Sequence, residues 1–207
     1  MKLGVVVASI GGAGVAAVGG YHYWPSNSVF ISIKDALKDS RLISDLPQAS
    51  LVKQWQEEFK SAKGDIAKDI EELKGVTEDV DGGKKLEAWC SSKMNLDSKK
   101  NGDTLKLVKK YCLIRDLSSQ LKRTNKSLLD KSQSGEWEAV YKKRQEGKSV
   151  RADVGLSDTN WPESKQSEEL STIQKWCEDT SKEDFLASNE KYNKLLKWCT
   201  VDGKNLT

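Results

Sequence analysis

The chain has 207 residues, a length that fits one large domain or two small ones. Its 34 Lys and Arg residues nearly balance its 31 Asp and Glu residues, and the two signs are interleaved, which argues against a nucleic-acid partner because such partners select clustered basic side chains. The single histidine, His22, lies beside the N-terminal apolar segment, so the sequence predicts no catalytic residue, no metal site and no cofactor.

The predicted membrane segment is 1–24. No residue from Leu3 to Gly20 is charged, and only Ser9 is polar. A helix of this length spans about 27 Å, close to the hydrocarbon thickness of a bilayer, which is about 30 Å. The sequence therefore predicts that 1–24 is a single-pass anchor whose partner is the lipid bilayer.

The flanks of this segment predict its orientation. Aromatic side chains that suit the headgroup region follow it directly, at Tyr21, Tyr23 and Trp24. Lys2 precedes the segment and the next positive charge is Lys34, so positive charge near the membrane lies on the N-terminal side. We expect the N-terminus inside the cell and the bulk of the chain outside it.

Small residues recur at every fourth position of the segment, at Gly4, Ala8, Gly12, Ala16 and Gly20. On a helix they form one ridge, the pattern that lets transmembrane helices pack closely, which predicts a homo-oligomer. A Gly/Ala-rich composition can also produce this spacing by chance. The rival to an anchor is a cleaved signal peptide with a site at Ala17–Val18–Gly19, after which the protein would be secreted.

The rest of the chain contains an internal repeat. The cysteines stand in two pairs, Cys90 with Cys112 and Cys177 with Cys199, and the members of each pair are 22 positions apart. A tryptophan precedes the first cysteine of each pair and an aromatic residue precedes the second, and the residue numbers of the two pairs differ by 87 throughout. Equal spacing with matching flanks is typical of a duplication.

Two further matches lie upstream of the cysteines. Trp55-x3-Phe59–Lys60 matches Trp137-x3-Tyr141–Lys142, where the residue numbers differ by 82, and Ile33–Lys34–Asp35 matches Ile114–Arg115–Asp116, where they differ by 81. The larger difference at the cysteines requires a five-residue insertion, for which the polar stretch 149–166 has room. Four matches in one order predict two tandem module copies, at 30–113 and 114–202.

Helical periodicity dominates both copies, so the predicted fold class is mainly α. An amphipathic helix, which Gly64 could divide, is predicted from the apolar positions Val52, Trp55, Phe59, Ala62, Ile66, Ile70 and Leu73. Each cysteine lies on an apolar helical face, which predicts a helical hairpin with one cysteine on each arm. Asn101–Gly102–Asp103 marks the turn in the first copy, and 181–184 can cap the second arm in the other. Short strands are compatible with 112–114 and 127–129.

The cysteine spacing favours disulfides within each copy, because facing positions on antiparallel helices can reach the required distance. Such a bond also suits a small module outside the cytoplasm. Buried free thiols are the main alternative. A zinc site is disfavoured because the chain has no C-x2-C pair.

The order of these motifs resembles the large paralogous families of uncharacterised proteins in haemotropic mycoplasmas. The resemblance covers nearly the whole chain, and the most characteristic stretch is Lys197–Trp198–Cys199–Thr200–Val201. It implies a membrane or surface location in a wall-less bacterium and a role in antigenic variation or host interaction. It implies no activity, cofactor or catalytic residue. The acidic, proline-free run 202–204 is a departure from that pattern.

Three functions follow from these features. The first is a non-enzymatic surface protein that binds a host or surface protein, or is displayed as an antigen. The second is a structural membrane protein that self-associates through its Gly/Ala ridge. The third is an enzyme, which is disfavoured because the sequence contains no convergent polar constellation.

Overall fold

A computed structural model of the protein describes residues 29–157, 160–161 and 166–207. Within these residues it contains eight α-helices, four short 3-10 helices and no β-sheet, so the predicted mainly-α class is confirmed. The predicted membrane segment, 1–24, lies outside the described residues. No helix in the described part combines the length and apolarity that crossing a membrane requires.

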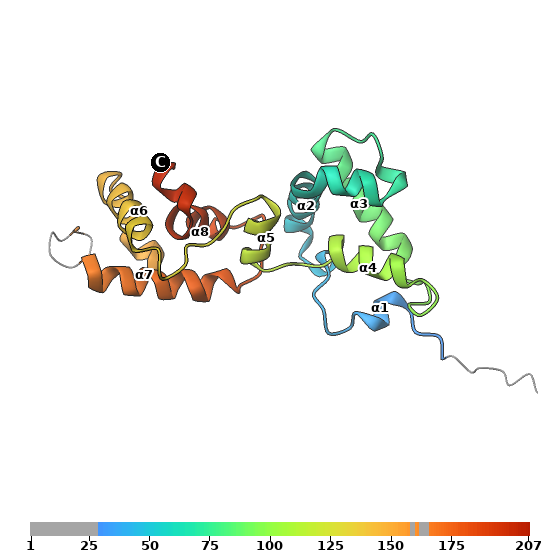
Figure 1. The fold of residues 1–207 in the computed structure, drawn as a ribbon. Coiled ribbons are helices and arrows are strands. Elements are labelled where there is room, and N and C mark those ends of the chain that lie inside the picture. Colours follow the sequence, from blue (N-terminus) through green and yellow to red (C-terminus); the bar gives the residue numbers. More distant parts are fainter. Residues whose placement is uncertain (1–28, 158–159, 162–165) are drawn as a thin grey trace, which may run out of the picture.

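The helices form two lobes, each with an apolar core of its own (Figure 1). The first lobe contains α1 (Ile33–Ala36), η1 (Ile43–Asp45), α2 (Gln48–Asp69), η2 (Glu71–Leu73), α3 (Asp79–Lys93) and α4 (Gly102–Tyr111). The second contains α5 (Leu117–Arg123), α6 (Ser134–Glu146), η3 (Arg151–Val154), α7 (Gln166–Ser181), α8 (Lys191–Cys199) and η4 (Val201–Asn205). The two core clusters share no residue. The first ends at Ile114 and the second begins at Leu117.

The long helix of the first lobe, α2, buries one stripe of side chains that includes Trp55, Phe59 and Ile66. The helix continues through Gly64, so the break that this glycine could introduce does not occur. The prediction that Val52 lies on the buried face is wrong, because its side chain is 56% exposed. Leu51 is buried instead, and adjacent helical residues lie about 100° apart around the axis.

Helix α3 packs closely against α2 through two glycines. A Cβ atom added at Gly82 would overlap the ring of Phe59, and one added at Gly83 would approach the backbone of Gln56. The two helices therefore pack so closely that only glycine fits at these two positions. This contact fixes the first arm of the cysteine hairpin against the core.

The predicted cysteine hairpins correspond to α3–α4 and α7–α8. Asn101 directly precedes α4, as the turn signal predicts. The predicted cap at 181–184 is wrong, because α7 extends to Ser181 and α8 begins only at Lys191. Asp184 instead forms a backbone bridge with Asp116, and the Asn189 side chain accepts a hydrogen bond from the Lys191 N–H.

The same pair of backbone contacts closes each lobe. The Ile33 N–H donates to the Leu96 carbonyl at 2.8 Å, and the Leu117 N–H donates to the Glu183 carbonyl at 2.8 Å. The Ile43 N–H donates to the Cys112 carbonyl at 3.0 Å, and the Leu129 N–H donates to the Cys199 carbonyl at 2.8 Å. The two acceptor residues of each comparison, Leu96 with Glu183 and Cys112 with Cys199, are separated by the same number of positions as Cys90 and Cys177.

These contacts change two details of the sequence interpretation. The expected strands at 112–114 and 127–129 are single bridges, Leu42 with Leu113 and Leu128 with Thr200. Ser32 caps α1 as Asp116 caps α5, and each forms a backbone bridge, Ser32 with Asp97 and Asp116 with Asp184. The motif match pairs Asp116 with Asp35 instead of Ser32, so it differs by three positions from the register of these caps and bridges.

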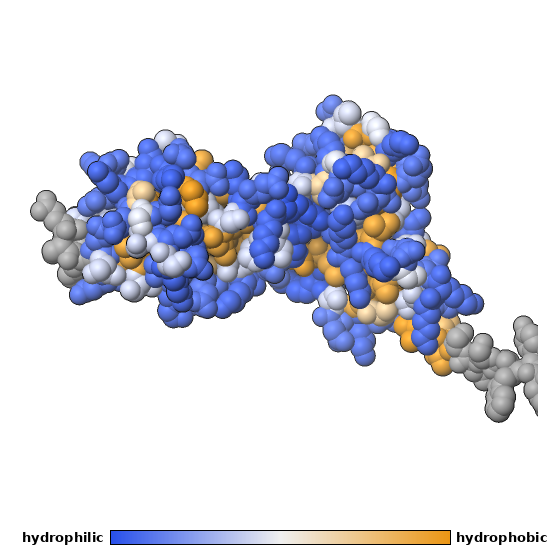
Figure 2. All heavy atoms as spheres, viewed as in Figure 1, coloured by the Kyte–Doolittle hydropathy of each residue, from blue (hydrophilic) through white to orange (hydrophobic). Residues whose placement is uncertain are grey.

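Hydrophilic side chains cover most of the face of both lobes that Figure 2 shows. Apolar atoms gather where the described chain begins, and Val29 and Phe30 are 70% and 61% exposed there. These two residues come directly after the sequence that includes the predicted anchor.

Candidate functional site

Both predicted disulfides are present. Cys90 bonds to Cys112 with their Cα atoms 5.9 Å apart, and Cys177 bonds to Cys199 with their Cα atoms 5.7 Å apart. All four side chains are buried, and the described residues include no free cysteine. The predicted membrane-packing residues (Gly4, Ala8, Gly12, Ala16 and Gly20) and interfacial belt (Tyr21, Tyr23 and Trp24) lie outside the described residues.

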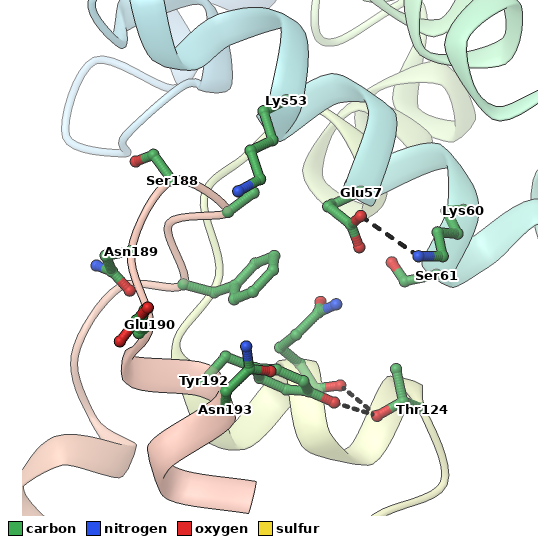
Figure 3. A pocket seen from close by; sticks show the side chains of 13 residues that line it. Lys53, Glu57, Lys60, Ser61, Thr124, Ser188, Asn189, Glu190, Tyr192 and Asn193 are labelled. Atoms are coloured by element: carbon green, nitrogen blue, oxygen red, sulfur yellow. Dashed lines mark hydrogen bonds and ion pairs between the residues drawn. The ribbon is translucent and has the colours of Figure 1, made fainter.

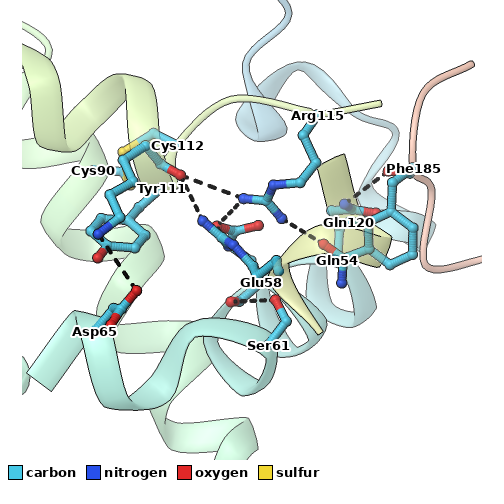
Figure 4. Close-up of polar contacts among 12 residues, drawn as sticks. Gln54, Glu58, Ser61, Asp65, Cys90, Tyr111, Cys112, Arg115, Gln120 and Phe185 are labelled. Atoms are coloured by element: carbon cyan, nitrogen blue, oxygen red, sulfur yellow. Dashed lines mark hydrogen bonds and ion pairs between the residues drawn. A yellow bond between two sulfur atoms is a disulfide. The ribbon is translucent and has the colours of Figure 1, made fainter. Parts of the chain in front are cut away.

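The two lobes meet around one buried carboxylate, that of Glu58 in α2 (Figure 4). Arg115 and Arg123, from the linker and from α5, each donate to Glu58 Oε1 at 2.5 Å. Arg123 also donates to the Lys110 carbonyl at 2.9 Å, and Arg115 donates to the Gln120 side chain at 2.9 Å. The carboxylate is fully buried, and these two guanidinium groups compensate for the lost hydration of Oε1, whereas Oε2 has no hydrogen-bond partner in the described part of the chain.

A second contact between the lobes uses the buried amide of Gln54, one helical turn before Glu58. Its Nε2 donates to the Phe185 carbonyl at 3.1 Å, and its Oε1 accepts from the Ala187 N–H at 2.7 Å. One side chain thus satisfies both a donor and an acceptor of the loop before α8. At the edge of this junction Arg41 forms an ion pair with Asp184.

Beside this junction lies a cleft of about 720 Å³, which we call the junction cleft (Figure 3). Helix α2 lines one side of the cleft, and helix α5, the loop before α8 and the start of α8 line the rest. The residues that line it are Lys53, Glu57, Lys60, Ser61, Gln120, Thr124, Phe185, Ala187, Ser188, Asn189, Glu190, Tyr192 and Asn193. Because both lobes contribute, the cleft depends on the junction contacts described above.

Most side chains that line the junction cleft can form hydrogen bonds, and the charged ones include both lysines and glutamates. Glu57 accepts from Lys60 at 3.5 Å, and the hydroxyls of Thr124 and Tyr192 are 2.7 Å apart. The Tyr192 ring meets the Phe185 ring edge to face, with centroids 5.5 Å apart. Such a surface can bind a polar ligand, and no cluster of His, Cys, Asp or Glu suited to a metal occurs in the described residues.

Two buried tyrosines make hydrogen bonds to carboxylates, one in each lobe. Tyr111 donates to Asp69 Oδ2 at 2.6 Å, and burial together with this bond raises the pKa of Tyr111 to about 12. Hydrogen bonds from Lys110, and then from Tyr111, hold the pKa of Asp69 below its usual value. In the second lobe, burial and a hydrogen bond to Glu169 raise the pKa of Tyr141 to about 12.

The sequence patterns did not mark the junction residues as functional. Gln54 and Glu58 share the buried stripe of α2 with Leu51, Trp55 and Phe59, at spacings of three and four. Polar residues on an otherwise apolar helical face were the signal that could have marked them, because such groups need buried partners. The partners themselves lie 57 to 133 positions away in the sequence.

Comparison with protein-family models, with curated proteins and with solved structures gives no match to this chain. The resemblance to haemotropic mycoplasma proteins therefore stays a prediction from the motifs.

Proposed function

We infer that the protein is a membrane-anchored, surface-displayed binding protein without enzymatic activity, built from two tandem copies of one helical module. The observation that carries this proposal is the disulfide within each lobe. Disulfides of this structural kind persist in oxidising compartments and are rare in the bacterial cytosol. They support display of 30–113 and 114–202 outside the membrane.

Three features support the tandem duplication. The disulfides join cysteines with the same sequence separation, 22 in each lobe. Each lobe is closed by the same two backbone contacts, whose carbonyl partners follow the register of the cysteines. Each lobe also contains a hairpin of two helices that its disulfide joins. Independent folds would not be expected to share these connections in one register.

The anchor is proposed from 1–24, whose apolar length matches a bilayer. Exposed Val29 and Phe30, close to that segment, suit a position near the membrane surface. The cell would then present both lobes to host or neighbouring surface proteins, which fits the role that the motif resemblance implies. The junction cleft, with its polar groups from both lobes, is the contact site we propose for such a partner.

Labelling of intact cells tests location and disulfides together. Proteolysis of intact cells should remove both lobes, and alkylation without reductant should leave all four cysteines unmodified. N-terminal sequencing should find residue 1 or 2, whereas a start near Gly20 would replace the anchor by a cleaved signal peptide. Protection from protease in intact cells, with four reactive thiols, would reject the surface location.

A second candidate function is a structural membrane protein that self-associates through its first segment. The repeated small residues from Gly4 to Gly20 favour it. Gly12→Leu should abolish dimers in detergent if the ridge is the interface, while the matched substitution Val7→Leu should leave them intact. Dimers that persist in Gly12→Leu would exclude this role of the ridge.

A further inference from the structure

Arg144 in α6 is a buried cation without a carboxylate partner among the described residues. Its side chain is 2% exposed, and its Nη2 donates to the backbone carbonyls of Gly203, at 3.0 Å, and Leu206. Its Nε has no hydrogen-bond partner in the described part of the chain. Burial alone shifts the pKa of this guanidinium downward, with no compensating carboxylate. A buried charge without an opposite charge beside it destabilises the fold. A bound anion would therefore stabilise the Arg144 guanidinium.

Arg144 lines a second cleft, of about 520 Å³, within the second lobe, which we call the Arg144 cleft. Lys194 and Lys197 contribute two further cations, and Asp153 and Glu190 are the carboxylates that line it. Asp153 is engaged with Lys194 at 2.7 Å. Lys197 makes no side-chain hydrogen bond or ion pair with the described residues, so it remains available beside the buried arginine.

Part of the lining of the Arg144 cleft is apolar. Val150, Leu196 and Leu206 belong to this part, and Val150 is 63% exposed. The volume lies within the range of small-molecule sites, about 300–1,000 Å³, in which apolar walls combine with a few fixed polar groups. The lining of the cleft thus includes both positively charged and aliphatic side chains.

We propose that the Arg144 cleft binds an aliphatic carboxylate, whose carboxylate group contacts Arg144 and Lys197 while its chain lies along Val150. A guanidinium suits a carboxylate because it keeps its positive charge and donates charge-assisted hydrogen bonds, here from the nitrogens other than Nη2, which already donates to Gly203 and Leu206. The ligand could be a free aliphatic acid or the C-terminus of a peptide that ends in an apolar residue. This site differs from the junction cleft, and its occupancy does not depend on where the cell places the protein.

The first lobe has no equivalent charge. In the register that pairs Trp55 with Trp137 and so relates α2 to α6, buried Ala62 stands in place of Arg144. The hairpin and core of the module can therefore form without a buried arginine at this position. This difference favours a specific role of Arg144 in the second lobe over a general requirement of the fold.

Titration calorimetry on the full chain in lipid nanodiscs tests the proposal, with empty nanodiscs as the blank. The probes are hexanoate and the tripeptide Ala-Ala-Leu with a free C-terminus, each compared with its neutral amide. We expect at least one acid to bind saturably, and its amide to bind about tenfold more weakly. Preference for hexanoate indicates a free acid as the natural source, and preference for the tripeptide indicates a peptide C-terminus.

Two variants assign the binding to this cleft. Lys197→Gln removes a partly exposed charge with little effect on folding and should weaken acid binding about fivefold. Arg144→Met should abolish binding, and its thermal unfolding shows whether the lobe remains folded. Lys53→Gln, in the junction cleft, is the matched control and should bind like the unaltered protein. Equal binding of acid and amide, unchanged binding in Lys197→Gln, or no saturable heat up to about 10 mM would overturn the proposal.

Discussion

The Tyr141 hydroxyl donates a hydrogen bond of 2.7 Å to Glu169 Oε2 inside the second lobe. Both terminal nitrogens of Arg151 donate to the same carboxylate, each at 2.8 Å. The positions of the first lobe that correspond to Tyr141 and Glu169 hold Phe59 and Gly82, and the Gly82 backbone lies against the phenyl ring. The hydroxyl and the carboxylate of this contact are both absent from those two positions of the first lobe, which is what the proposed duplication predicts if the copies diverged at both partners of one contact.

Gly82→Ala should destabilise the first lobe. The added Cβ would overlap the ring of Phe59, which is itself fully buried, so the helices must separate. Overpacking of this kind costs about 1–3 kcal/mol. Gly64→Ala is the matched control: it lies in α2 with no atom within 4 Å of the new Cβ, and it should stabilise by about 0.5–1 kcal/mol. Urea unfolding of both variants measures the difference, and equal free energies would contradict the close packing.

Tyr141→Phe should change how stability depends on alkaline pH. The pKa of Tyr141 in the folded protein is about 12, above its ordinary value of 10.0, so folding favours the neutral phenol. This stabilisation is complete below pH 10 and is lost as the pH rises from 10 to 12. The variant should lose about 1 kcal/mol of unfolding free energy at neutral pH.

The variant should also show a shallower decline of stability between pH 10 and 12 than the unaltered protein. Phenolate absorbance, measured in parallel, should lose one late-titrating group. Tyr111 serves as an internal reference, because its pKa is also raised to about 12 and its partner Asp69 is unchanged. If the group that is lost titrates instead near the ordinary tyrosine value of 10.0, the result would contradict the assignment of the hydrogen bond to Glu169.

Glu58→Gln should weaken the junction of the lobes. The substitution leaves Arg115 and Arg123 beside a neutral amide, and removing one partner of a buried ion pair costs about 3–5 kcal/mol. Calorimetric unfolding should show either a lower single transition or two separate ones. Glu57→Gln, at the preceding position of α2, is the control: its ion pair with Lys60 is exposed, and the change should stay below about 1 kcal/mol. Equal effects of the two variants would mean that Glu58 does not hold the lobes together.

The hairpins and disulfides could be predicted because their signals are local or covalent. The spacing of Cys90 and Cys112 places both on apolar faces of consecutive helices, and no distant residue is needed to reach that conclusion. Helical periodicity also identified the stripe of α2. It misplaced Val52, since apolar character alone does not decide between neighbours such as Leu51 and Val52 that face different directions.

The junction could not be predicted in the same way. Glu58 and Gln54 indicate only that a polar group is buried, while their partners are set by how the two lobes dock. The motif match at Ile114 differs by three positions from the register of the caps and bridges for a related reason. The bridges of Ser32 with Asp97 and of Asp116 with Asp184 are tertiary contacts. Short sequence matches carry too little information to fix the register of such contacts.

Removing each disulfide in turn should destabilise the protein to a similar extent. Replacing Cys90 and Cys112 by Ser, or Cys177 and Cys199 by Ser, opens a loop of the same length in either lobe. The chain-entropy model assigns about 3 kcal/mol to a loop of this size, so each double variant should lose a similar free energy of unfolding. The two losses should add in the quadruple variant, because the disulfides belong to separate cores. Urea unfolding under non-reducing conditions measures all four proteins, and mass spectrometry confirms the remaining bond in each double variant. A loss confined to one pair would mean that the lobes depend unequally on their disulfides, and it would contradict the view that both copies of the module use the same covalent stabilisation.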